Sequence, residues 1–263
     1  MASGLVIEAA WATAHLVMYP LGLLSTPTRT PNGRLHQKLS GLTPEQRGLV
    51  HHDVGAAETP ILLVHGIIDN HAIFTVMERT LRRRGFQTLS AYDYGVLTHN
   101  ISRAAVRLGE AIEKLSAATG YERIHVIGHS MGGLIARYYV QRLAGDRHVH
   151  TLVTLGTPHH GTQLAWAAPL LPLVRQLTPN SSVIHELAEP ASGCRTRFIV
   201  FYSDIDHLIV PSSNARLDHS DLNVRNVAVR GVGHLSMANN GHIAFTIAEA
   251  LRQLDYAPGH GTR

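Results

Sequence analysis

The stretch VIGHSMGGLIARYYV, residues 126–140, decides how this chain folds. It starts with an apolar run, turns through six residues dominated by glycine, and continues with the apolar spacing of a helix. Within it, Gly128-His129-Ser130-Met131-Gly132 has the pattern G-x-S-x-G. A sharp strand-to-helix turn strains the backbone of the central serine and leaves no room for bulky neighbours, which the glycines satisfy. The stretch therefore predicts an exposed nucleophilic serine, with a tight glycine turn and an idle serine as the alternative.

The helix that follows Ser130 bears on its chemistry. Its N-terminus would point at the serine, where the helix dipole and free backbone N–H groups favour negative charge. The backbone N–H of Met131 is then placed to stabilise a developing oxyanion. Ser130 and Met131 are thus a predicted nucleophile and a predicted oxyanion donor.

Strands and helices alternate on both sides of this stretch. Apolar runs typical of buried strands occupy residues 59–66, 86–94, 123–130, 149–157, 196–203 and 224–232. Helical patterns lie near residues 71–84, 101–118, 131–144 and 238–254. Near-continuous apolar strands separated by helices indicate an α/β fold with a mostly parallel central sheet and helices on both faces.

Composition excludes several other classes of protein. A chain of 263 residues with 44% hydrophobic residues is long enough for a full core and is not typical of a disordered protein. Its net charge of +4 is scattered apart from Arg82-Arg83-Arg84, so we expect no nucleic-acid partner. Nineteen histidines show no metal-ligand spacing, and no metal is expected. The single Cys194 excludes an intrachain disulfide and leaves the compartment undetermined.

The first 58 residues are predicted to be an N-terminal apolar helix and an irregular lead-in to the catalytic domain expected for residues 59–263, and not a domain of their own. Residues 4–24 are strongly apolar but contain Glu8 and His15, and Pro20 ends any helix. No basic segment precedes this run, as a secretory signal would require, and its helical part is shorter than the ~20 residues of a membrane span. We expect a helix docked on the protein, with adsorption to a lipid surface as the alternative. A cytoplasmic or peripherally membrane-associated location is favoured over secretion.

Four segments resemble the α/β-hydrolase superfamily, and within it bacterial lipases and esterases. They are LLVHGI, GHSMGG, TLGTPHHGT and the pair YSDIDHLIVP and GVGHLSM, which together span residues 59 to about 255. The resemblance implies an α/β-hydrolase fold with a small lid or cap insertion, a Ser-Asp-His triad and no cofactor. It also implies that the backbone N–H of Ile67, after His65-Gly66, is the second oxyanion donor. We expect His65 to support this loop and His159 and His160 to shape the pocket wall.

The partners of Ser130 should follow it in the order acid, then histidine. His234, flanked by glycines after the last predicted strand, is the expected base; its rivals are His219, His242 and His260. The loop after RFIVFYS offers two acids, Asp204 and Asp206. The family's acid, followed by an apolar pair and a proline, matches Asp206, which leaves Asp204 as the alternative.

The long connection at about residues 159–195 falls where α/β hydrolases insert a lid. Its apolar residues are candidates for an acyl pocket or a lipid contact, with ordinary core packing as the alternative. They are Trp166, Leu170, Leu171, Leu173 and Val174. The few charges nearby favour an uncharged acyl ester as substrate.

The expected activity is therefore that of a carboxylic-ester hydrolase of lipase or esterase type, acting on acyl esters or acylglycerols through an acyl-enzyme. An acyltransferase or thioesterase with the same triad is the first alternative, because these reactions share acyl-transfer chemistry. A non-catalytic, membrane-associated binding protein with this fold is the second. The sequence does not determine the oligomeric state.

Overall fold

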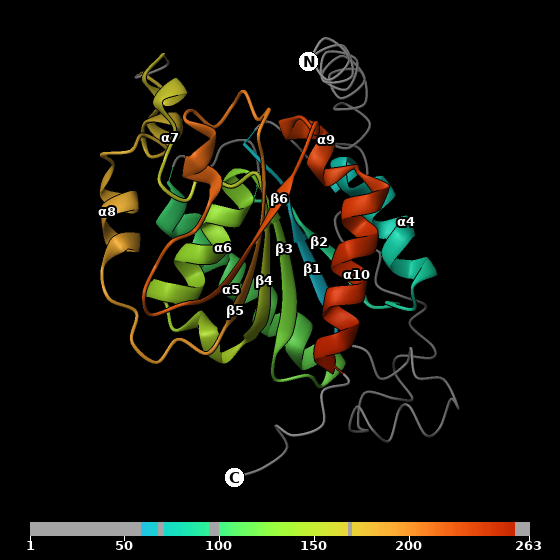
Figure 1. The fold of residues 1–263 in the computed structure, drawn as a ribbon. Coiled ribbons are helices and arrows are strands. Elements are labelled where there is room, and N and C mark those ends of the chain that lie inside the picture. Colours follow the sequence, from blue (N-terminus) through green and yellow to red (C-terminus); the bar gives the residue numbers. More distant parts are fainter. Residues whose placement is uncertain (1–58, 68–70, 95–99, 168–169, 256–263) are drawn as a thin grey trace, which may run out of the picture.

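The computed structural model describes residues 59–67, 71–94, 100–167 and 170–255 (Figure 1). The predicted lead-in of residues 1–58, with its apolar helix, lies outside the described residues. None of the helices within the described ranges is both long and apolar enough to cross a membrane. The separate domain boundary at residue 58 stays a prediction.

Six strands form one sheet in the order β2-β1-β3-β4-β5-β6, and every neighbouring pair is parallel. The strands are β1 (Ile61–Val64), β2 (Leu89–Tyr92), β3 (Ile124–His129), β4 (Val149–Leu155), β5 (Arg197–Ser203) and β6 (Asn223–Val229). Five of them lie within the apolar runs that predicted them, and β6 begins one residue before its run of residues 224–232. The predicted α/β fold with a parallel sheet is confirmed.

Helices cover both faces of this sheet, which explains why the central strands β1 and β3 are buried at every position (Figure 1). Ile61 and Leu63 of β1 point into a core shared with α4 and α10, whereas Leu62 and Val64 point into the core shared with α5 and α6. These helices are α4 (Thr75–Arg83), α5 (Ile101–Thr119), α6 (Met131–Arg142) and α10 (Gly241–Asp255). Successive side chains of a strand thus serve opposite layers.

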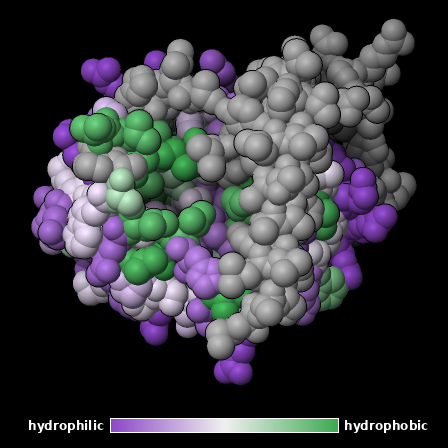
Figure 2. Space-filling model, turned by 90° about the horizontal axis from the view of Figure 1, so that it is seen from above, coloured by the Kyte–Doolittle hydropathy of each residue, from purple (hydrophilic) through white to green (hydrophobic). Residues whose placement is uncertain are grey.

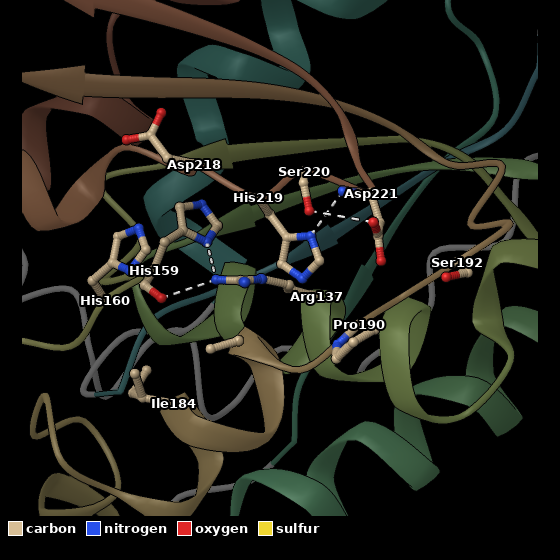
Figure 3. Close-up of a pocket in the computed structure, with 11 residues that line it drawn as sticks. Arg137, His159, His160, Ile184, Pro190, Ser192, Asp218, His219, Ser220 and Asp221 are labelled. Carbon is tan, nitrogen blue, oxygen red and sulfur yellow. Dashed lines mark hydrogen bonds between the residues drawn. The ribbon is translucent and has the colours of Figure 1, made fainter.

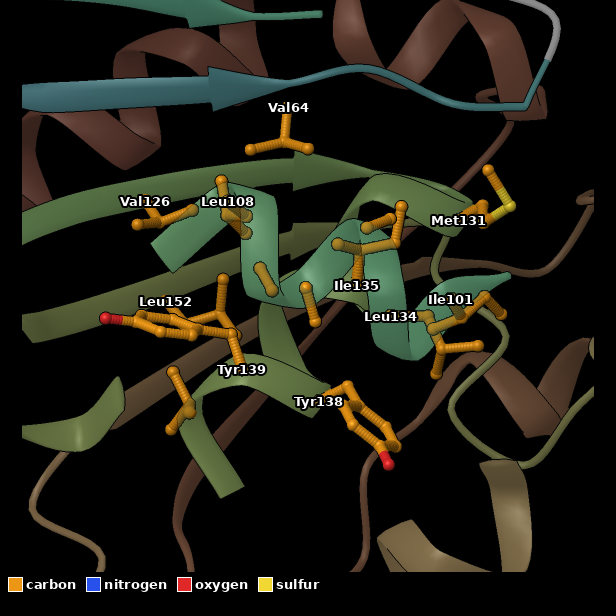
Figure 4. Packing of buried hydrophobic residues seen from close by; sticks show 14 of the residues in the cluster. Val64, Ile101, Leu108, Val126, Met131, Leu134, Ile135, Tyr138, Tyr139 and Leu152 are labelled. Carbon is orange, nitrogen blue, oxygen red and sulfur yellow. The ribbon is translucent and has the colours of Figure 1, made fainter. Parts of the chain in front are cut away.

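The layer formed by α5 and α6 holds the start of α6 in place. Figure 4 shows Leu108 of α5 and Ile135 of α6 directed into the same cluster as Val126 and Leu152 of the sheet. All four side chains are fully buried. Because truncating such a core residue to alanine costs about 2–5 kcal/mol, this packing firmly fixes α6.

The predicted helices differ from the structure mainly at their ends. Residues 71–84 divide into a 3₁₀ turn, η2 (His71–Phe74), and α4. A short helix, α9 (His234–Ala238), precedes α10, although we predicted a single helix from residue 238. The break arises at Asn240, whose side-chain oxygen accepts the N–H groups of His242 and Ile243 and so caps α10.

The connection between β4 and β5 carries most of the irregular structure. It contains η4 (Gln163–Ala167), α7 (Pro172–Arg175) and α8 (Ser182–Ala188). Two further 3₁₀ turns are η3 (Gly145–Arg147), before β4, and η5 (Ser212–Ala215), after β5. These short elements lie on the α6 side of the sheet or above it (Figure 1). That this connection acts as a lid stays a prediction.

Strand order also marks where a ligand would bind. The chain runs from β1 outward to β2 and then returns to β3 on the other side of β1. Such a reversal separates the loops that follow β1 and β3, and it opens a crevice at the carboxyl ends of these strands. The loop after β1 and the turn after β3 contain Ile67 and Ser130.

Candidate active site

Ser130 occupies a strained turn between β3 and α6. Its φ and ψ are 52° and −124°, and a positive φ is uncommon for a residue that carries a side chain. Its N–H donates to Leu155 O at 2.8 Å, and its carbonyl accepts the hydroxyl of Thr157 at 2.9 Å. The hydrogen bonds on both sides hold this residue in the strained conformation that the G-x-S-x-G pattern predicts.

The glycines around Ser130 are required by close backbone contacts. A Cβ on Gly128 would lie 2.5 Å from the Cα of Gly133, so the strand and helix meet at these two residues. A Cβ on Gly132 would lie 2.2 Å from His65 O, at the end of β1. The first turn of α6, which begins at Met131, is therefore packed directly against the loop that contains Ile67.

A buried acid–histidine pair lies at the carboxyl ends of β5 and β6. His234 is the first residue of α9, and its Nδ1 is 2.8 Å from Asp206 Oδ2. The side chains of His234 and Asp206 are only 4% and 0% exposed. Because a carboxylate only accepts hydrogen bonds, Nδ1 carries the proton and Nε2 is the nitrogen that can take one up.

Neighbouring groups fix this pair in place. Asp206 Oδ1 accepts the backbone N–H groups of Leu208 and Ile209 at 3.0 and 3.1 Å. Below the pair, His129 Nε2 donates to the carbonyl of His234 at 3.1 Å. Gly156, after β4, has a φ of +54°, and a Cβ there would lie 3.0 Å from Asp206 Oδ2. Both His129 and Gly156 stand in the motifs that carried the resemblance, but their contacts were not predicted.

The alternative acid, Asp204, has different contacts. Its carboxylate is exposed and accepts the N–H of Gly231 at 3.0 Å, which ties the loop after β5 to the loop after β6. Of the two acids, Asp206 is the one that contacts His234. Ser130, Asp206 and His234 therefore follow the ends of β3, β5 and β6 at one edge of the sheet.

Comparisons with known proteins agree with this architecture. A family model of the alpha/beta hydrolase fold matches residues 59–176. A Bacillus licheniformis lipase in its mature form matches with a TM-score of 0.60 and 18% identity, over 74% of this chain and 91% of that chain. This chain has the α/β-hydrolase fold. Aspergillus fumigatus lipase B matches this chain with a TM-score of 0.63 and 19% identity, over 74% of this chain and 52% of that chain.

Two of the curated relatives that this chain resembles are named triacylglycerol lipases. The protein of Vibrio cholerae is 31% identical over 134 residues, which cover 49% of this chain and 40% of that protein. The protein of Pseudarthrobacter phenanthrenivorans is 29% identical over 120 residues, which cover 42% of this chain and 36% of that protein. The chain thus spans less than half the length of the curated relatives it matches. The predicted resemblance to bacterial lipases and esterases is confirmed.

The five predicted substrate-binding residues divide into two groups. Trp166 is 54% exposed and Leu170 is 92% exposed, and Leu171 is exposed as well. Leu173 and Val174 of α7 are partly buried against the core beside α6, as in the alternative of ordinary packing. Figure 2, seen from above, shows apolar side chains gathered on part of this face of the molecule. Further exposed apolar residues are Leu164, Leu208 and Val210.

The rivals of His234 and the histidines of the predicted pocket wall lie in different surroundings. His219 Nε2 donates to Glu189 O and its Nδ1 accepts the N–H of Asp221, so both ring nitrogens are used. His242 is exposed on α10, and His260 lies outside the described residues. Burial lowers the pKa of His159 well below its usual value, and this residue contacts Thr154 Oγ1 at 2.9 Å. Within the described part of the chain, no group of three or more His, Cys, Asp or Glu could hold a metal ion.

A polar cavity of about 420 Å³ lies beside α6 and α8, away from the acid–histidine pair. Figure 3 shows Arg137 at its floor, with His159, His160 and His219 beside it. Burial and then the charge of Arg137 lower the pKa of His160. Ser130, Asp206 and His234 are not among the residues that line this cavity, so His159 and His160 form the wall of a space separate from the predicted site.

Proposed function

We propose that this protein hydrolyses carboxylic esters, with Ser130 as the nucleophile, His234 as the general base and acid, and Asp206 as the residue that orients His234. The observation that carries the proposal is the buried 2.8 Å contact between His234 and Asp206, at the edge of the sheet where the strained turn presents Ser130. This combination supports acyl transfer, because a serine hydroxyl needs a base and the base needs an orienting acid.

In the proposed reaction, Ser130 Oγ attacks the ester carbonyl while its proton passes to His234 Nε2. The backbone N–H groups of Ile67 and Met131 stabilise the oxyanion of the tetrahedral intermediate. His234 returns the proton to the leaving alcohol, which departs and leaves an acyl-serine. Water, deprotonated by His234, then hydrolyses the acyl-enzyme and restores Ser130. None of these steps needs a cofactor.

We propose uncharged acyl esters, and acylglycerols in particular, as the substrate class. The curated relatives are named triacylglycerol lipases, and exposed apolar side chains surround this end of the molecule. Trp166, Leu170 and Leu171 are exposed enough to contact a lipid surface. Leu173 and Val174 pack against the core, so they would affect an acyl chain only indirectly, by holding α7 in position.

The proposal is tested with a fluorophosphonate probe and with p-nitrophenyl esters of increasing chain length, with and without an emulsified triglyceride. The wild-type protein should be labelled and should hydrolyse the esters. Ser130→Ala should abolish labelling and remove several orders of magnitude of rate while the protein stays folded. A folded Ser130→Ala protein that keeps a large share of its rate would show that Ser130 is not the nucleophile.

An acyltransferase or thioesterase remains the alternative within the same chemistry. Adding a competing alcohol distinguishes the two outcomes, because a hydrolase releases mainly free acid whereas a transferase forms the new ester. An intact protein that neither reacts with the probe nor hydrolyses any ester would favour the non-catalytic binding protein instead.

A further inference from the structure

The half-buried carboxylate of Asp93 contacts two histidines after β2, the edge strand farthest from β6 in the sheet, whereas Asp206 follows β5. Asp93 directly follows β2, next to the end of β1. Its Oδ1 lies 3.0 Å from His65 Nε2, and its Oδ2 lies 3.1 Å from His71 Nδ1. The two histidines stand on either side of the segment that contains Ile67, so one carboxylate is tied to both ends of the loop after β1.

Other contacts fix the same loop. Tyr94 stacks on the ring of His65, with the ring centroids 4.4 Å apart and the planes 22° apart. Its hydroxyl donates to His65 O at 3.0 Å and contacts Gly66 O. On the opposite side, Gly132 allows α6 to approach His65 O so closely that a Cβ would not fit. The backbone that leads to Ile67 is therefore packed between β2 and the start of α6.

The electrostatics favour an ionised Asp93 in this position. Burial acts to raise the pKa of Asp93, but the hydrogen bond and charge of His65, together with those of His71, outweigh burial and lower it. His65 is almost fully buried, and its Nδ1 faces Gly66 O at 2.8 Å while its Nε2 faces Asp93. The ring is thus held by its short contacts with Gly66 O and Asp93 and by its stacking on Tyr94, although the approach of Nε2 to Asp93 Oδ1 lacks the geometry of a hydrogen bond.

We propose that Asp93 is a positioning residue of the oxyanion hole, which acts through His65 to hold the backbone N–H of Ile67 in place. The inference rests on the proposed function, because it concerns the oxyanion of that reaction. An oxyanion donor stabilises the transition state only where it already points at the developing charge. The residues packed around the donor, here His65 and Asp93, keep it in that orientation. Asp93 has no part in proton transfer.

The test uses Asp93→Asn, which keeps the size of the side chain and removes its charge, and Asp93→Ala. The matched control is Asp221→Asn, another partly buried carboxylate, which accepts the N–H of Ala191 far along the chain from this loop. Steady-state kcat and KM are measured on p-nitrophenyl butyrate. The inhibition constant of phenylboronate is measured as well, because its tetrahedral serine adduct places an oxygen in the oxyanion hole.

Both Asp93 variants should lose about tenfold in kcat, with KM within about twofold of the wild type, because removing an oxyanion donor outright costs about 10²–10³ in kcat. The phenylboronate inhibition constant should rise by a similar factor. The Asp221→Asn control should leave all three values close to those of the wild type. Since an inhibition constant does not depend on the fraction of folded enzyme, a fall in kcat with an unchanged inhibition constant would overturn the inference.

His65→Phe separates action through His65 from an independent effect. This variant should raise the inhibition constant at least as much as Asp93→Asn, and the double variant should raise it no further than His65→Phe alone, because both changes act through the contact between His65 and Asp93. Additive effects would overturn the proposed route through His65. A wild-type protein without esterase activity or probe labelling would refute the proposed function, whereas an active wild type with unaffected Asp93 variants would refute only this inference.

Discussion

Two aspartates on one loop illustrate how environment separates residues of the same type. Asp206 is buried and accepts two backbone N–H groups as well as the contact with His234. Asp204, two residues earlier, is exposed and accepts the N–H of Gly231. A buried carboxylate with three donors is held in one orientation, which a residue must have in order to fix the tautomer of a histidine.

Asp206→Asn should therefore reduce kcat by about three to four orders of magnitude, because an amide can present an N–H to Nδ1 and stabilise the wrong tautomer. Asp204→Asn should change kcat by less than about tenfold, since its contact is at the surface. Ester hydrolysis by both purified variants, with thermal melting as the control for folding, checks this order. Equal losses, or a larger loss for Asp204→Asn, would transfer the orienting role to Asp204.

At the scale of elements, a single buried arginine joins α6 to the connection between β4 and β5. Arg137 is 2% exposed and donates to His159 O at 2.9 Å and to Leu187 O of α8 at 2.8 Å. Burial, followed by the nearby charge of Arg142, lowers its pKa to about 9, so the guanidinium is still charged at neutral pH. The helix that begins at Ser130 and the short helix α8 are thus held together by hydrogen bonds to a cation.

Arg137→Met should lower the free energy of unfolding by about 2–5 kcal/mol, because the buried carbonyl of His159 would lose its donor and that of Leu187 would keep only the longer hydrogen bond from Gln141 Nε2, at 3.4 Å. The matched control is Arg142→Met on the same helix. Arg142 also donates to two carbonyls, those of Glu189 and Pro190, but these bonds are exposed, so this change should cost less than about 1 kcal/mol. Urea unfolding of both variants gives the comparison, and similar midpoints for the two would contradict the proposed role of burial.

Across the whole molecule, the sheet has a buried layer on each face and the residues of the predicted triad at the carboxyl ends of its strands. One of the residues buried beside the sheet is the histidine His159. Burial lowers the pKa of His159 well below its usual value, so the folded protein keeps this residue uncharged under conditions in which an unfolded chain would bind a proton. Global stability is therefore coupled to pH through a residue outside the predicted triad.

The sign of this coupling follows from the direction of the pKa change. The contribution of His159 is fully present above its unfolded pKa of about 6.5, and it is lost as the pH falls from there toward the folded pKa. We expect the free energy of unfolding to decrease below pH 6.5 by up to about 1.4 kcal/mol per pH unit from this residue. In His159→Gln the decrease should be shallower. Urea unfolding from pH 8 to pH 5 tests this expectation, and parallel curves for the two proteins would contradict it.

Much of the fold follows from local sequence. The six apolar runs predicted the six strands, and the central ones are the most apolar because strands covered on both faces need apolar residues at every position. The glycines around Ser130 predicted the strained turn, because the crowding they relieve arises between neighbours in the chain. Helix ends were less predictable, as the cap at Asn240 shows, since short polar residues end and start helices equally well.

Only the tertiary structure decided which distant residues meet. Asp204 and Asp206 have the same chemistry and neighbouring places in the sequence, and the conformation of their loop determines that Asp206 contacts His234. The contact of Asp93 with His65 joins residues 28 positions apart, and it exists because β1 and β2 end side by side in register. The sequence by itself determined the elements and the strained turn at Ser130, because those depend on periodicity and local crowding. The pairing of side chains depended on how loops from separate strands meet at one edge of the sheet.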